Sequence, residues 1–221
     1  MRLSARARST IGGAAEQFGA SRPLSHRAAI FDADDPPSKA ATLDAALSLF
    51  VRHGIDATSV RDIASRSGFT NPAIFKHFDS KSDMALCLFE RCYGWMTLHL
   101  LAAEAACPEA DPRARILAIA ACALRLMDED IEAVLMVQDN LRRFWPSASP
   151  AVRSVTLLGR VRSLAAAVLG TDPGQASPRF IASAIVGFLA QIARELYFGE
   201  FEGLAAAREA QVQDIIQKLL K

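Results

Sequence analysis

The sequence has little of what marks several functional classes. Aromatic residues make up only 7% of its 221 residues, and the formal net charge is +1. With so little excess charge the chain has no strong overall field to attract a polyanion, so any nucleic-acid binding must come from a local patch. Four cysteines are present without the paired spacing of a metal site or a disulfide framework: Cys87, Cys92, Cys107 and Cys122. We expect buried, inert thiols in a reducing compartment.

Long apolar segments are also missing. The first 30 residues contain no apolar core of the kind that a secretory signal needs. The longest apolar stretch, residues 181–193, includes Gln191 and is flanked by Arg179 and Arg194, and it is too short to cross a bilayer. The sequence therefore predicts a cytoplasmic protein with no membrane partner.

Signatures of catalysis are missing as well. The sequence has no nucleophile elbow, no Gly-rich phosphate-binding loop and no His/Cys metal cluster, and its four histidines are scattered at positions 26, 53, 77 and 99. We therefore expect no enzyme, no catalytic or metal-binding residues and no cofactor. A helical binding module without DNA contact is a further alternative to a DNA-binding protein, and substitution of Lys81 and Asn71 separates the two because only the DNA-binding protein loses affinity.

The residues that are present favour an all-α protein in three parts. Hydrophobic residues make up 51% and charged residues 22%, a globular balance in which Ala and Leu dominate. Residues 1–38 carry several arginines and an acidic, Pro-containing end without a sustained helical face, so we expect a disordered arm. That arm is either a dispensable tail, a basic arm that follows DNA or the product of a misassigned start site. The other parts are residues 39–83 and residues 84–221.

Residues 39–83 have the outline of a helix-turn-helix. Apolar residues between positions 41 and 50 predict a first helix, and Gly54 stands where a helix end favours positive φ. Thr58 and Ser59 are rival N-caps for a short second helix over 60–67, and Asp62 completes a capping-box pattern with Ser59. Gly68 ends that helix, and a third helix is expected from about position 70 to position 78. Two short helices joined by a tight turn that contains Gly are typical of this motif.

The first turn of the third helix is the candidate for reading DNA bases. Ile63 and Ile74 are expected to meet where the two helices cross. A second helix in the major groove exposes its first turn to base edges, and asparagine pairs bidentately with adenine. Proline suits the first helical position, which favours Asn71 as the cap, but Thr70 is a rival, and the sequence leaves both open.

The run TSVRDIASRSGFTNPAIFKHFDSKSDM (58–84), with LDAALSLFVRHG (43–54), resembles the signature of the TetR family of bacterial repressors. The resemblance implies DNA contacts by Thr58, Ser59, Arg61, Thr70, Asn71, Pro72, Ala73, Phe75, Lys76, His77 and Lys81. Phe75 departs from the family, which usually has a tyrosine there, so one phosphate contact is expected to be lost. Because residues 39–83 hold six Lys/Arg against five Asp/Glu, affinity must depend on placement and dimerisation.

Residues 84–221 are expected to be helical throughout. Apolar spacing of three and four residues, with punctuating prolines and glycines, predicts helices at 82–106, 112–127, 130–144, 151–169, 178–198 and 205–220. The resemblance implies that this part binds an unidentified small-molecule effector and forms a homodimer. Ten residues mix apolar bulk with polar groups, as ligand pockets do, although a plain core is the alternative: Phe89, Tyr93, Met96, His99, Met127, Leu135, Gln138, Trp145, Phe188 and Gln191.

The candidate dimer interface combines the last two predicted helices. Small residues on the helix at 178–198 permit close approach, and the expected interface residues are Ala184, Gly187, Gln191, Val212, Ile216 and Leu219. A dimer places two reading helices in successive major grooves about 34 Å apart on double-stranded operator DNA. The resemblance favours repression that is relieved by the ligand.

Overall fold

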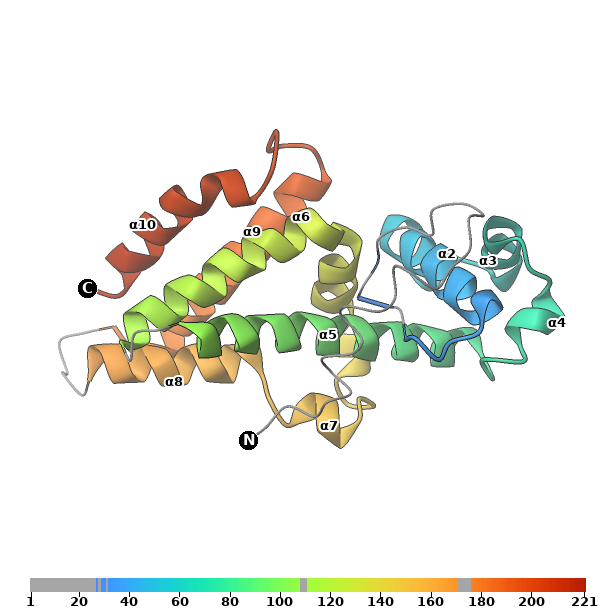
Figure 1. Ribbon diagram of the computed structural model, residues 1–221, viewed down its shortest axis with the longest axis horizontal. Coiled ribbons are helices and arrows are strands. Elements are labelled where there is room, and N and C mark those ends of the chain that lie inside the picture. Colours follow the sequence, from blue (N-terminus) through green and yellow to red (C-terminus); the bar gives the residue numbers. More distant parts are fainter. Residues whose placement is uncertain (1–26, 28, 31, 108–110, 171–175) are drawn as a thin grey trace. The chain divides into compact units, whose positions relative to one another are not determined.

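The computed structural model describes residues 27, 29–30, 32–107, 111–170 and 176–221, and over these residues the chain is helical without strands. The predicted all-α fold is confirmed. The helices are α2 (Pro37–His53), α3 (Val60–Ser67), α4 (Asn71–Ile74), α5 (Lys81–Ala106), α6 (Pro112–Phe144), α7 (Pro150–Arg153), α8 (Leu157–Leu169), α9 (Pro178–Tyr197), η1 (Ala206–Arg208) and α10 (Glu209–Leu219) (Figure 1). The chain divides into two units, residues 1–92 and residues 93–221, within α5 and later than the expected boundary at 83/84.

The first unit is built on α2, against which both α3 and α4 pack. Its core consists of fully or almost fully buried apolar side chains from all of its helices: Leu43, Leu47, Phe50, Ile63, Ile74, Phe78, Met84 and Leu88. Ile63 and Ile74 are both 0% exposed, as expected of residues at the crossing of two helices. Gly54 ends α2 at φ 83° and Gly68 ends α3 at φ 77°, a region of backbone conformation that strains residues with a Cβ.

The end of the predicted N-terminal arm is packed, which corrects the expectation that residues 1–38 are loose. Ala29 and Ile30 are 5% and 1% exposed, and Arg27 pairs with Asp44 on α2 at 3.0 Å. Helix α2 begins at Pro37, where the fixed φ of proline suits the first turn. The remainder of the predicted arm, residues 1–26, 28 and 31, lies outside the described residues.

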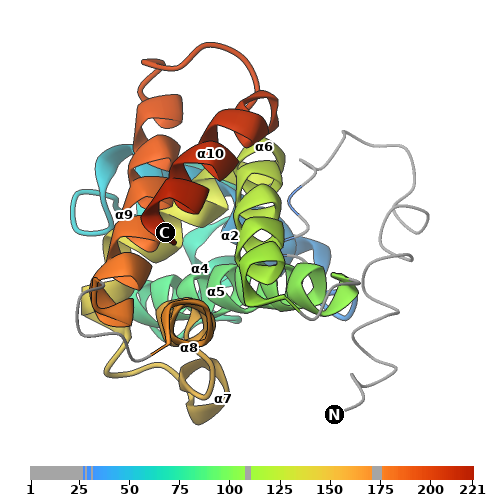
Figure 2. The same ribbon diagram turned by 90° about the vertical axis from the view of Figure 1, so that its left-hand side faces the viewer.

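In the second unit, α6, α8 and α9 pack on one another and α10 lies across α6 and α9 (Figures 1 and 2). The helices expected at 112–127 and 130–144 are joined in α6 without a loop between them. A kink marks the join, because Asp130 has φ −153° and ψ 85°. Its carboxylate accepts a hydrogen bond from the amide of Ala133 at 3.0 Å and so caps the second half of the helix.

Two other predicted helices are broken. The helix expected at 151–169 consists of α7 and α8, because the hydroxyl of Thr156 accepts from the amide of Gly159 at 3.0 Å and starts a new helix. The helix expected at 205–220 begins with the 3-10 turn η1, whose first amides are held by the carboxylate of Asp128. Helix α9 is long and apolar enough to span a membrane by length and composition, a test that core helices of soluble proteins also pass.

Candidate nucleic-acid interface

The connection between α2 and α3 is held from within the first unit. Thr58 is 3% exposed, and its hydroxyl donates to the carbonyl oxygens of Gly54 at 2.8 Å and Leu49 at 3.3 Å. The ammonium group of Lys81 donates to the carbonyl oxygens of residues 55, 56 and 58 at 2.7, 3.3 and 2.7 Å. Since an ammonium group has three N–H donors, this triad occupies it. Thr58 and Lys81 thus have a structural role within the first unit, and the phosphate contacts expected of them remain predictions.

Helix α3 begins with the predicted capping box. The amide of Asp62 donates to the hydroxyl of Ser59 at 3.1 Å, and the amide of Ser59 donates to the Asp62 carboxylate at 3.0 Å. Hydrogen bonds from the side chain and the backbone of Ser59 lower the pKa of the exposed Asp62 carboxyl. Arg61 is exposed in the same turn. Ser59 is therefore fixed as the N-cap, and Arg61 offers an accessible cation beside it.

The short helix α4 resolves the question of its cap. Thr70 is the N-cap, with extended φ −82° and ψ 156°, and Asn71 is the first helical residue. No hydrogen bond from the Thr70 side chain caps the helix. Thr70 and Pro72 are exposed, while Asn71 and Ala73 are half-buried. The predicted reading turn is thus a surface feature, and Asn71 does not serve as its cap.

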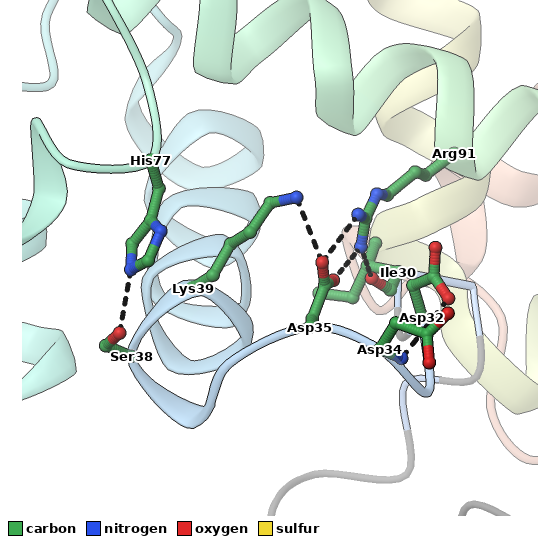
Figure 3. Close-up of polar contacts among 8 residues, drawn as sticks. All are labelled: Ile30, Asp32, Asp34, Asp35, Ser38, Lys39, His77 and Arg91. Atoms are coloured by element: carbon green, nitrogen blue, oxygen red, sulfur yellow. Dashed lines mark hydrogen bonds and ion pairs between the residues drawn. The ribbon is translucent and has the colours of Figure 1, made fainter.

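The residues after α4 divide between the surface and the interior of the unit. Phe75 is 49% exposed and Lys76 is exposed. The half-buried His77 lies against α2, where its Nε2 is 2.8 Å from the hydroxyl of Ser38 (Figure 3). His77 is therefore a link between helices. The exposed part of the predicted site consists of Ser59, Arg61, Thr70, Pro72, Phe75 and Lys76.

The ten residues of the predicted ligand pocket are not gathered around one cavity. Phe89 is 0% exposed and belongs to the first unit, whereas Gln191 is exposed on α9. Tyr93 donates to the carbonyl oxygen of Val155 at 3.1 Å and packs beside Trp145, with ring centroids 5.6 Å apart. Met127 and Leu135 are buried, and the others are half-buried: Met96, His99, Gln138, Trp145 and Phe188. All of these side chains except Gln191 are buried or half-buried, which fits the alternative interpretation of the pattern as core, and the ligand site remains a prediction.

Two hollows in the second unit are lined by residues other than the ten predicted ones. A narrow one, with room for about one water molecule, is lined by Thr97, Leu100, Leu101, Ile119, Val155, Leu157 and Arg160. A more open one adjoins it and is lined by Leu101, Glu104, Ala105, Arg115 and Arg160. At its edge the guanidinium of Arg160 forms a bidentate ion pair with the carboxylate of Glu104, whose side chain is 5% exposed. No sequence signal marked this pair, since its members lie on different helices.

The predicted dimer residues divide by helix. Ala184, Gly187 and Gln191 are exposed on one side of α9. Val212 and Ile216 on α10 are 3% and 0% exposed, because they pack into the second unit of their own chain. Leu219 is half-buried. This corrects the expectation for Val212 and Ile216, which offer no surface to a partner.

Comparison with known proteins shows what the chain is similar to. Residues 43–88 match the family model described as "Bacterial regulatory proteins, tetR family". The transcriptional repressor KstR2 of Rhodococcus jostii is 32% identical over 115 residues, which are 50% of this chain and 55% of that repressor. The aligned segment thus spans about half of that relative.

Solved structures extend the similarity of fold to most of the chain. A tetR-family regulatory protein from Rhodococcus superposes with a TM-score of 0.68 at 16% identity, covering 84% of this chain and 98% of the other. The ketosteroid transcriptional regulator KstR2 of Mycobacterium tuberculosis gives 0.68 at 19% identity, covering 80% and 92%. Motif, sequence relatives and fold agree, and the chain belongs to the TetR family of bacterial regulatory proteins.

Proposed function

We propose that the chain is a sequence-specific DNA-binding transcriptional regulator, a cytoplasmic homodimeric repressor whose operator binding is relieved by a small molecule. The observation that carries this proposal is the exposed first turn of α4, with Thr70 and Pro72 at the surface above the fully buried Ile63 and Ile74. A rigid frame beneath an exposed first turn is what a recognition helix needs in the major groove.

Affinity for the DNA backbone has two sources in the first unit. Arg61 and Lys76 are exposed on either side of the reading turn and can contact phosphates. The N-terminus of α3 adds backbone N–H groups, which favour phosphate. Phe75 packs against sugar or methyl groups but donates no hydrogen bond. Two reading units on one operator compensate for the small number of cations in each.

The exposed side of α9 supports the homodimer. Phe180 is 74% exposed, and Ala184, Gly187 and Gln191 follow it at helical spacing on exposed positions. Small residues let a second helix approach closely, and an exposed apolar stripe of this kind is typical of a surface that a partner covers. We expect Gly187→Arg to convert the protein into a monomer in analytical ultracentrifugation. A wild-type monomer at micromolar concentration contradicts the dimer.

The effector is proposed to enter the second unit. The open hollow beside Leu101, Glu104 and Arg115 adjoins the narrow apolar one, so a ligand can widen the inner space by moving side chains. Only a difference in the ligand's affinity for the two conformations of the protein can drive release of DNA. A ligand screen on the protein–operator complex tests this step, and a broad screen without any release counts against it.

The DNA-binding proposal is tested by a gel shift with DNA from upstream of the protein's own gene, at about 50 and 200 mM salt. We expect a specific complex that weakens with salt. Asn71→Ala should cost about 1–3 kcal/mol and relax base preference, while Lys76→Ala should weaken all sequences and reduce the salt slope by about 1. Lys218→Ala, on the exposed side of α10, is the matched control and should change neither.

Lys81→Ala is a less direct test, because its ammonium group holds the connection between α2 and α3. If the wild-type protein selects no sequence from a random DNA pool at the lower salt concentration, sequence-specific binding is contradicted. If it selects a site but Asn71→Ala and Lys76→Ala bind that site like the wild type, the reading turn has been placed on the wrong residues.

A further inference from the structure

Arg91, on α5 in the first unit, binds the segment that precedes α2. Its Nη1 donates to the carbonyl oxygen of Ile30 at 2.6 Å and to the Asp35 carboxylate, and its Nη2 donates to the other Asp35 oxygen at 3.1 Å (Figure 3). The Arg91 side chain is 19% exposed. Both terminal nitrogens are occupied within the unit, so Arg91 acts on the structure of its own chain.

Asp35 is the centre of this contact. Its side chain is 6% exposed and also accepts from the ammonium group of Lys39 at 2.9 Å. Burial raises the pKa of the Asp35 carboxyl, but hydrogen bonds from Arg91 and Lys39 outweigh it and leave the pKa below its ordinary value. A buried carboxylate with two cationic partners is stable only while both partners hold their places. The entry to α2 is therefore fixed to α5.

The first turn of α2 also contacts the segment that follows α4, the helix proposed to read DNA bases. Ser38 lies between Asp35 and Lys39 in this region and its hydroxyl bonds Nε2 of His77, just after α4 (Figure 3). The hydroxyl of Thr42 donates to the carbonyl oxygen of Ser38 at 2.7 Å and keeps that turn in place. Helix α4 has four residues. So short a helix cannot fix its own direction, and its orientation depends on contacts such as these.

We propose that Arg91 is a positioning residue for DNA binding, which sets the orientation of α4 through Asp35, the first turn of α2 and the Ser38–His77 contact. The inference rests on the proposed DNA-binding function for its consequence. The structural link itself is independent of that function. Loss of Arg91 should loosen the end of α4 while α3, with its buried Ile63, stays folded.

The link is tested by hydrogen exchange and mass spectrometry on the full chain, compared with circular dichroism. We expect Arg91→Ala to increase exchange in residues 74–80 and residues 36–42, with residues 60–67 and the helical content unchanged. Arg91→Lys keeps the charge but loses the planar pair of N–H donors, so its exchange should lie between that of the wild type and that of Arg91→Ala. Arg125→Ala removes an exposed arginine from the second unit and is the control. Unchanged exchange at residues 74–80 in both Arg91 variants overturns the inference, whatever the protein does with DNA.

Operator affinity then separates positioning from general destabilisation. Arg91→Ala and Ser38→Ala should each weaken binding to the selected operator by about tenfold, and the double variant should be little worse than either, because both break one chain of contacts. If the double variant loses about as much affinity as the product of the two single losses, the two residues act independently and the proposed chain of contacts from Arg91 to His77 is wrong. Normal affinity in Arg91→Ala overturns the positioning role. A wild-type protein without an operator contradicts the proposed function, and the exchange experiment still decides the link.

Discussion

The two units of the chain differ in how locally their structure is encoded. In the first unit, short-range features end and start each helix: Gly54 and Gly68 adopt positive φ, and Ser59 and Asp62 form a capping box. In the second unit, helix breaks depend on single side chains without a strong signal, as at Thr156 before α8. Spacing of apolar residues alone predicts a helix across that break.

The difference between the two units follows from how far apart in the sequence the interacting residues lie. A turn that needs a residue at positive φ restricts the sequence to glycine or a few polar residues, so it can be recognised. A pair such as Glu104 and Arg160, 56 positions apart, leaves no local trace. We therefore expect the helix ends of the first unit to depend on local caps and turns and those of the second on single side chains. Distant polar pairs stabilise both units, since Arg91 and Asp35 of the first unit are also 56 positions apart. Four measurements can break or sharpen this comparison.

The largest effect is expected in the core of the first unit. Ile74→Ala removes a side chain that is 0% exposed and should lower the free energy of unfolding of this unit by about 3 kcal/mol. Phe75→Ala, at the neighbouring exposed position, should change it by less than about 1 kcal/mol. Urea unfolding followed by circular dichroism measures both, whereas the fluorescence of Trp95 and Trp145 reports on the second unit. Equal effects would mean that the burial pattern around α4 is wrong.

The second effect concerns the polar pair of the second unit. Arg160→Ala leaves Arg115, at 3.9 Å, as the one cationic partner of the almost buried Glu104 carboxylate among the described residues. The substitution should lower the free energy of unfolding by about 2 kcal/mol, less than for a fully buried pair because Arg160 is 40% exposed. The double variant Glu104→Met with Arg160→Met should recover most of this loss in the same unfolding measurement. A double variant as unstable as Arg160→Ala contradicts the argument that an unpaired carboxylate is the cause.

The same contrast explains how much could be predicted from the sequence. The all-α fold, the span of α3 and the capping box were predicted because each has a local physical cause. The internal role of Lys81 was not, because the carbonyl groups that bind it belong to a loop more than 20 residues earlier. The burial of Val212 and Ile216 could not be predicted either, because an apolar stripe does not reveal whether its own chain or a partner covers it.

A smaller effect tests the local encoding of α3. Ser59→Ala removes the side-chain half of the capping box and should lower the free energy of unfolding of the first unit by about 1 kcal/mol. Ser82→Ala, an exposed serine in the first turn of α5, is the matched control. The two variants are compared by urea unfolding. If Ser82→Ala costs as much as Ser59→Ala, the capping box does not define this helix.

The smallest effect is the pH dependence of the Asp35 contact. The pKa of this carboxyl is held below its ordinary value of 3.8, so its ionised form stabilises the folded unit at every pH above that value. The stabilisation is lost as the pH falls through the lower, folded-state pKa. The difference in melting temperature between the wild type and Asp35→Asn should therefore be constant from about pH 7 to about pH 5 and shrink below about pH 4. Asp34→Asn, at a neighbouring exposed carboxylate, should show no such change. A difference that persists at about pH 2 would place the stabilisation in contacts other than the charge of Asp35.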